Sequence, residues 1–174
     1  MTRSTTLNMA RLLAILTLAL FSATSYAQDV LDEIAKHQER IDRIANDISA
    51  SQRRITASAN TSPAQDRTYE QLNRVFYILM AAKQEFYALS QSLMLAALVT
   101  DKKLIPLARR IVEGREDSMV GLFQINTKFA EETLASARDP ETSRLLLEAR
   151  DVLKASTDLV IHLKTSKAKW PATK

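Results

Sequence analysis

The chain contains no cysteine, two glycines and four prolines among its 174 residues. Without cysteine it forms no disulfide and carries no thiol chemistry, so its stability must come from side-chain packing. The scarcity of glycine and proline leaves little turn chemistry for a sheet. No stretch sustains the alternation of apolar and polar residues that marks strands. We therefore expect almost no β-structure.

Catalytic motifs are also absent from the sequence. There is no G-x-S-x-G elbow, H-E-x-x-H helix, phosphate-binding loop, dinucleotide fingerprint, EF-hand loop or C-x-x-C-H haem attachment. A ferritin-like di-metal bundle needs Glu-x-x-His on two of its helices. Neither histidine here has a glutamate three residues before it. We therefore expect a protein that is not an enzyme.

Residues 1–27 have the pattern of a secretory signal peptide. Two arginines precede an apolar run at residues 12–21, and small residues lead to an expected cut between Ala27 and Gln28. The run has about ten residues, too few to cross a hydrocarbon core of about 30 Å, and no cysteine follows it for lipid attachment. We expect a periplasmic or secreted protein with no transmembrane anchor after cleavage.

The net charge does not indicate a nucleic-acid partner. The chain has 24 basic and 20 acidic residues, and the predicted signal takes two of the basic ones, leaving 22 against 20. These charges interleave along the chain, which is typical of solvent-exposed helix faces. We expect no nucleic-acid binding.

Four amphipathic segments follow the predicted signal, and we expect helices at about 29–57, 63–99, 103–137 and 140–166. Ser62, Pro63 and Gln65 form a capping-box pattern with proline at the first helical position. Asp139 and Pro140 mark the start of the last helix in the same way. The third helix is less regular, because a polar patch surrounds Gly114, where a kink or break is one alternative.

Apolar residues in each segment recur at spacings of three and four, with a clear coiled-coil-like heptad pattern in the first. The expected core positions are Val30, Ile34, His37, Ile41, Ile44, Ile48, Ser51 and Ile55; Leu72, Val75, Leu79, Ala82, Phe86, Leu89, Leu93 and Ala96; Leu104, Ala108, Ile111, Leu122, Ile125, Phe129 and Thr133; and Leu145, Ala149, Val152, Ser156, Leu159 and Leu163.

Long helices joined by short connectors predict an all-α fold, an antiparallel up-down-up-down four-helix bundle at residues 28–165. Residues 166–174 are expected to be a basic, flexible tail. Trp170 lies among the lysines of this tail. The alternatives there are a weak contact with an envelope surface and no contact at all.

The first candidate site is a pocket between the second and third helices, for a small hydrophobic or aromatic ligand. The alternative to a cavity is close packing of the two backbones at the glycines. Arg115 either points into this pocket and pairs with Glu85, or extends outward to solvent from a kinked turn. The candidate residues are Phe76, Met80, Phe86, Tyr87, Gly114, Arg115 and Gly121.

The second candidate site is a metal centre at one end of the bundle. His37 near the start of the first helix and His162 near the end of the last meet if the helices are antiparallel. Glu33 and Asp158 each precede a histidine by four residues, so each shares a helix face with it. These side chains suit zinc or copper, and two histidines suit haem. The alternative is a packing histidine with an ordinary ion pair.

Together these features predict a non-catalytic binding or interaction protein of the bacterial envelope, sensor-like or an adaptor, with an unknown protein partner or a small ligand. No resident cofactor is expected from this interpretation. The alternative is a periplasmic metal- or haem-binding bundle that uses His37 and His162.

Overall fold

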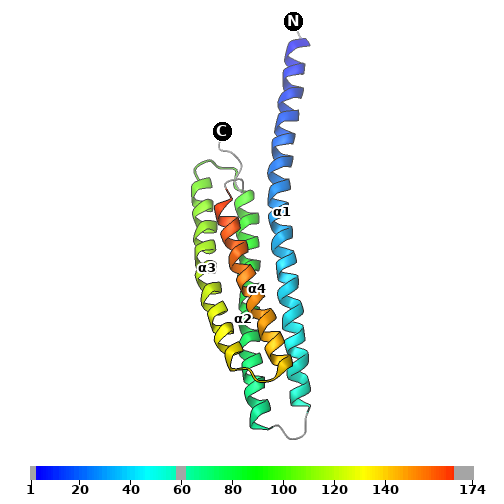
Figure 1. The fold of residues 1–174 in the computed structure, drawn as a ribbon. Coiled ribbons are helices and arrows are strands. Elements are labelled where there is room, and N and C mark those ends of the chain that lie inside the picture. The colour runs from blue at the N-terminus through cyan, green and yellow to red at the C-terminus, as the bar shows by residue number, and fades with distance from the viewer. Residues whose placement is uncertain (1–2, 58–61, 167–174) are drawn as a thin grey trace.

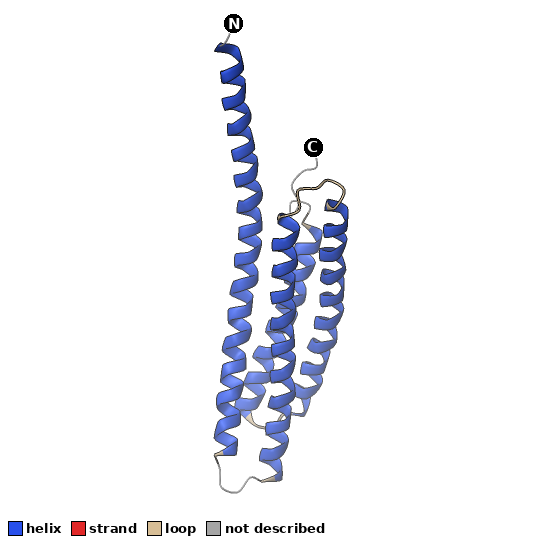
Figure 2. Cartoon of the chain, turned by 180° about the vertical axis from the view of Figure 1, so that it is seen from behind, coloured by secondary structure: helices blue, strands red, loops and turns tan. Residues whose placement is uncertain are grey.

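The computed structural model describes the backbone of residues 3–57 and 62–166, and the side chains of residues 28–57 and 62–166. Its helices are α1 (Arg3–Thr56), α2 (Pro63–Ala97), α3 (Ile105–Ser136) and α4 (Pro140–Thr165). The described part contains no strand (Figure 2). The described part of the chain is therefore all-helical, as expected, and the four helices in it are consistent with a four-helix bundle.

The helices lie side by side, and the N-terminal part of α1 projects beyond the other three (Figure 1). Within the described residues, no helical segment combines the length and the hydropathy needed to cross a membrane. Of the predicted tail, residues 167–174, including Trp170, lie outside the described part.

The predicted start signals of α2 and α4 are present as hydrogen bonds. The Gln65 backbone N–H donates to Ser62 Oγ at 3.3 Å, and the Ser62 N–H donates to Gln65 Oε1 at 2.8 Å, which completes the capping box. At α4, the Thr142 N–H donates to an Asp139 carboxylate oxygen at 2.7 Å. These local contacts satisfy N–H groups that the first turn of a helix leaves free, so both helices begin where the sequence predicts.

The core faces predicted for α1, α2 and α4 are confirmed. Every expected core position of α4 is buried, and those of α1 and α2 are buried except at Ile55, Leu93 and Ala96, which are half-buried against the same core. A broad apolar stripe on each helix therefore faces its neighbours, as burial of hydrophobic surface requires.

The core face predicted for α3 is confirmed at Thr133, which is buried, whereas Ala108, Leu122 and Phe129 are half-buried and Leu104, Ile111 and Ile125 are exposed. The observed core face is therefore rotated by about one residue from the predicted one. Ile111 and Ile125, expected inside, are 57% and 69% exposed. One residue along a helix is about 100° of rotation, so the face that meets the core is the adjacent one. The α3 residues that are buried are Val112, Glu116, Met119, Phe123, Ala130 and Thr133.

α3 also runs without a break from Ile105 to Ser136, through Gly114. Neither of its glycines has a positive φ angle, so both fit ordinary helical backbone. The break considered near Gly114 does not occur.

Candidate functional site

His37 sits at the centre of the bundle and is only 8% exposed. Its Nε2 lies 2.8 Å from Ser156 Oγ and 3.3 Å from the Val152 carbonyl oxygen, both on α4. Ser156 Oγ itself lies 2.8 Å from the same carbonyl and donates its single hydroxyl proton to it. This network assigns the ring proton to Nε2, which donates to Ser156 and Val152. The imidazole nitrogen is thus used to join α1 to α4.

A chain of rings extends from His37 across the core. The His37 and Phe86 rings lie 5.3 Å apart between centroids, inclined at 59°. Phe86 of α2 and Phe123 of α3 are also 5.3 Å apart, inclined at 36°. Both phenylalanines are fully buried. With Ser156 on α4, side chains from all four helices meet at this level, and we call these four residues the central cluster.

Burial lowers the pKa of His37 below its ordinary value of 6.5. The Val152 carbonyl raises the pKa by accepting the ring proton, whereas the positive charge of Arg40 lowers it and the negative charge of Glu33 raises it. Loss of hydration is the largest of these effects, so the folded protein favours the neutral imidazole.

The structure does not bring the predicted metal ligands together. His162, Glu33 and Asp158 are all exposed. Among the described residues, no three histidine, aspartate or glutamate side chains are grouped so as to hold a metal ion. His37 meets Ser156, which lies six residues before His162 on α4. Six residues of helix correspond to about 9 Å and a turn of about 240°, so His162 lies on another face.

The predicted pocket between α2 and α3 is not formed by its two glycines. Gly114 and Gly121 are exposed, and a Cβ atom built on either meets nothing within 4 Å. They therefore neither open a cavity against α2 nor let the two backbones approach, which corrects both alternatives. The cause is the rotation of α3, which turns this face to solvent.

The aromatic residues expected in that pocket are divided between the core and the surface. Phe86 is fully buried and Phe76 is half-buried, whereas Tyr87 is 58% exposed. Met80 and Tyr87 line a shallow hollow of about 220 Å³ that α1 completes through Gln38. This part of the predicted site thus lies beside α1 rather than beside α3.

Arg115 pairs with Glu85 of α2 through an Nη1 to Oε2 contact of 3.2 Å. Both side chains are about one-third exposed, 36% and 35%, so the pair lies at the edge of the core. Together with Ile111 and Ser118 they line a hollow of about 260 Å³. Of the two alternatives for Arg115, the structure has the pairing with Glu85.

Sequence reasoning missed a buried acid in α3. Glu116 is 0% exposed, in a stripe that otherwise carries small or apolar residues and Thr133. The neighbouring Asp117 accepts a hydrogen bond from Lys164 Nζ of α4. That bond is the main cause that raises the pKa of Lys164, and the charges of Asp117, Glu116 and Glu113 raise it further. Sequence patterns place charged residues in solvent, which is why the burial of Glu116 was not predicted.

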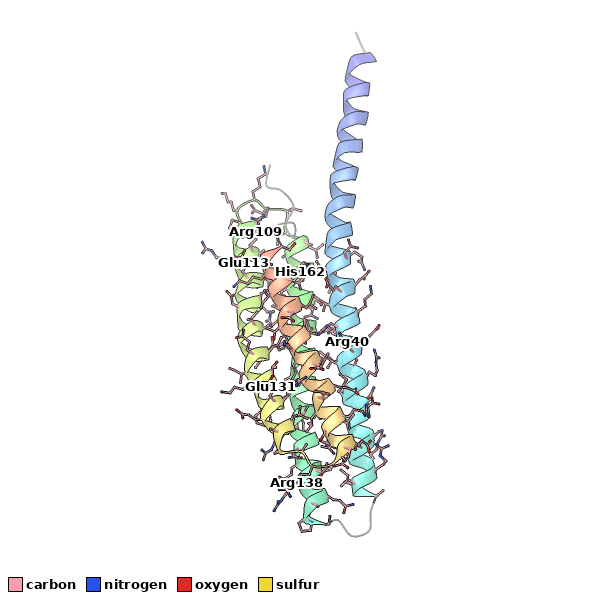
Figure 3. The ribbon with its side chains drawn as sticks, viewed as in Figure 1. Arg40, Arg109, Glu113, Glu131, Arg138 and His162 are labelled. Atoms are coloured by element: carbon pink, nitrogen blue, oxygen red, sulfur yellow. The ribbon has the colours of Figure 1, made fainter. Side chains whose placement is uncertain are left out.

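Figure 3 places Arg109, Glu113 and His162 in the half of the bundle nearest the α2–α3 connection, and Glu131 and Arg138 in the opposite half. The same upper half carries exposed large apolar residues that the sequence assigned to the core or left unassigned. Leu107 and Ile111 lie four residues apart on α3, and Leu104, the residue before this helix begins, lies three residues before Leu107; all three are at least half exposed.

Comparison with known proteins gives no relative. The chain matches no protein-family model, no curated protein and no solved structure. Function must therefore be argued from the residues themselves.

Proposed function

We propose that this protein is a non-catalytic, exported helical bundle of the bacterial envelope that acts as a binding or interaction module through its outer surface. The observation that carries the proposal is the set of large apolar side chains exposed along α2 and α3, such as Tyr77, Leu95 and Ile125, each more than 60% exposed. Isolated exposed apolar residues are ordinary, but a gathering of them on two adjacent helices is typical of an interaction surface.

The interior offers less support for a ligand-binding role. His37 is already bonded to Ser156 and packed against Phe86. The hollows around Met80 and Arg115 open at the surface between helices, and both polar and apolar residues line them. A small molecule inside the bundle would have to displace the central cluster, which is costly because close-packed cores relax poorly.

The proposed topology is the antiparallel up-down-up-down arrangement. Contacts between α1 and α2 support it, because Gln52 bonds to Asn73, Asp42 pairs with Lys83 and His37 packs on Phe86. Lower residue numbers in α1 thus lie beside higher residue numbers in α2, as expected for antiparallel helices. The contacts between α2 and α3 follow the same order, because Glu85 pairs with Arg115 and the earlier Gln71 bonds to the later Ser136.

The register of α1 and α2 supports the proposed signal cleavage. Ala97, the last residue of α2, lies fourteen residues after Lys83, and Gln28 lies fourteen residues before its partner Asp42. The end of α2 is therefore level with the expected mature N-terminus of α1. Cleavage between Ala27 and Gln28 would remove the part of α1 that projects beyond the bundle (Figure 1) and leave the packed part intact.

Export is tested by expressing the full chain with a C-terminal epitope in a Gram-negative host and sequencing the N-terminus of the fractionated product. The proposal expects a periplasmic or secreted protein that begins at Gln28. A matched Ala27→Arg variant should accumulate unprocessed, because signal cleavage requires a small residue there. A full-length wild-type product in the cytosol would refute the export proposal.

The binding role is tested by photo-crosslinking in intact cells. A photoreactive residue at Ile125 should give a discrete adduct, whereas the same residue at the exposed position Lys154 of α4 should not. Equal labelling at both positions, or none at either, would contradict an interaction surface on α2 and α3.

A further inference from the structure

Exposed apolar residues concentrate around the connection between α2 and α3. Of the eleven large apolar side chains that are exposed in the described part, six lie within residues 94–111, which we call the hairpin tip. They are Met94, Leu95, Leu98, Leu104, Leu107 and Ile111. Their exposed fractions run from 47% to 76%, and the most exposed is Leu98, directly after α2 ends.

Positive charge surrounds these residues. The hairpin tip contains Lys102, Lys103, Arg109 and Arg110 against one acid, Asp101. The carboxylate of Asp101 accepts a hydrogen bond from the Lys103 backbone N–H at 2.9 Å, so it also serves to shape the connection. Lys102, Lys103 and Arg110 are exposed. The hairpin tip thus presents leucines with a basic rim.

The N-terminal projection of α1 and the end of α4 lie at the same end of the bundle as the α2–α3 connection (Figure 1). The chain that continues from there beyond Ser166 contains three lysines, one tryptophan and no acidic residue. Basic residues are therefore present both in the hairpin tip and in the sequence that directly follows α4.

We infer that the hairpin tip docks on the surface of an anionic lipid bilayer. Leucine side chains enter the boundary between headgroups and acyl chains, while the lysine and arginine side chains extend to the phosphates. Anionic lipid complements the positive charge of the tip and of the adjoining chain.

This inference names a partner for the upper part of the proposed interaction surface, so the membrane it meets in the cell depends on the proposed export. Lipid binding itself is measured separately. The processed protein recovered from the producing cell is incubated with vesicles of phosphatidylcholine alone or with 30% phosphatidylglycerol, and bound protein is separated by sedimentation. We expect binding to the phosphatidylglycerol vesicles, with loss at high salt because screening weakens surface electrostatics.

Two variants test the residues that carry the inference. Lys102→Glu/Lys103→Glu should weaken binding by about 30-fold or more, since each basic residue near an anionic surface contributes about fivefold. Leu98→Glu/Leu107→Glu should weaken it by at least about tenfold, because the inserted apolar area is lost. The matched controls are Lys128→Glu on α3 and Leu147→Glu on α4, both exposed and outside the tip. They should bind within about twofold of wild type.

Circular dichroism and the urea midpoint establish that each variant is folded, which exposed positions favour. Absence of wild-type binding, unchanged binding of both tip variants, or equal losses in the controls would overturn the inference. So would concentration-dependent self-association that Leu98→Glu/Leu107→Glu abolishes, because a second copy would then cover the tip. A failure of export appears instead as an unprocessed N-terminus and leaves the comparison among variants readable.

Discussion

Acidification from pH 7 to 5.5 should destabilise this protein through His37. Burial lowers the pKa of this imidazole below 6.5 in the folded state, whereas the unfolded chain returns to the ordinary value. Between those two pKa values the unfolded state binds the proton and the folded state does not. The free energy of unfolding therefore falls as the pH drops through 6.5 and stops falling below the folded pKa.

The size of the effect has an upper limit. For a histidine that stays neutral in the folded state, the free energy of unfolding decreases by at most about 1.3 kcal/mol between pH 7 and 5.5. With a urea m-value of about 2 kcal/mol/M, that corresponds to a shift of about 0.6 M in the midpoint. His37→Gln removes this contribution and keeps an N–H donor for Ser156. It should cost about 1–3 kcal/mol at pH 7, mainly through the lost ring contact with Phe86.

The assay is urea unfolding followed by circular dichroism at pH 7 and 5.5 for wild type, His37→Gln and His162→Gln. His162 is exposed, so its replacement removes a histidine without touching the core. Wild type and His162→Gln should show the same pH dependence, and His37→Gln a smaller one. If all three lose the same stability between the two pH values, the reasoning from the buried imidazole is refuted.

Three further predictions concern stability. Phe86→Ala should cost about 3–5 kcal/mol, because this fully buried ring joins two others; an unfolding midpoint near wild type would mean that the ring contacts are absent. Gly114→Ala and Gly121→Ala should each add about 0.5–1 kcal/mol in thermal unfolding, since their Cβ atoms meet open space within a helix; a loss would show that this face is covered. Asp139→Ala should cost about 1 kcal/mol at pH 7 by removing the cap on Thr142. Because that bond lowers the pKa of Asp139 below 3.8, the cost should disappear as the pH falls through the folded pKa, and an equal cost at pH 2 would contradict the role of the carboxylate.

Three helices were oriented correctly from sequence because the apolar residues at their heptad positions form a continuous stripe. In α1, every position at the heptad spacing from Val30 to Ser51 is buried, and the residues between Ile41 and Ile48 leave no second apolar face. Capping is equally local, since Ser62 contacts a residue only three positions away. Such features are readable without knowledge of the rest of the fold.

α3 has two overlapping apolar stripes, which is why its orientation could not be read. One stripe contains Ile111 and Ile125, and the other contains Val112 and Phe123, about 100° away. The stripe that is buried also includes Glu116, a charged residue that is expected in solvent from sequence alone. The wrong orientation of α3 also made the predicted pocket wrong. Gly114 and Gly121 were placed against α2, but the actual rotation of the helix exposes both glycines to solvent.

The candidate metal site shows the same limit. His37 was placed correctly on the core face of α1, but the residue that meets it on α4 is Ser156 and not His162. Ser156 and His162 both lie on α4. Which of them meets His37 depends on how far α4 is shifted along its axis, and how it is rotated, relative to α1. Neither the shift nor the rotation is encoded in the periodicity of a single helix.

The sequence by itself determined that the chain is helical, where α2 and α4 begin, and which sides of α1, α2 and α4 face the core, because these depend on contacts within a few residues and on the burial of a single apolar stripe. Only the tertiary structure decided the rotation of α3, the partner of His37 and the exposure of the leucines at the hairpin tip. These depend on how side chains from different helices interlock, and several rotations satisfy the local pattern equally until the neighbours are in place.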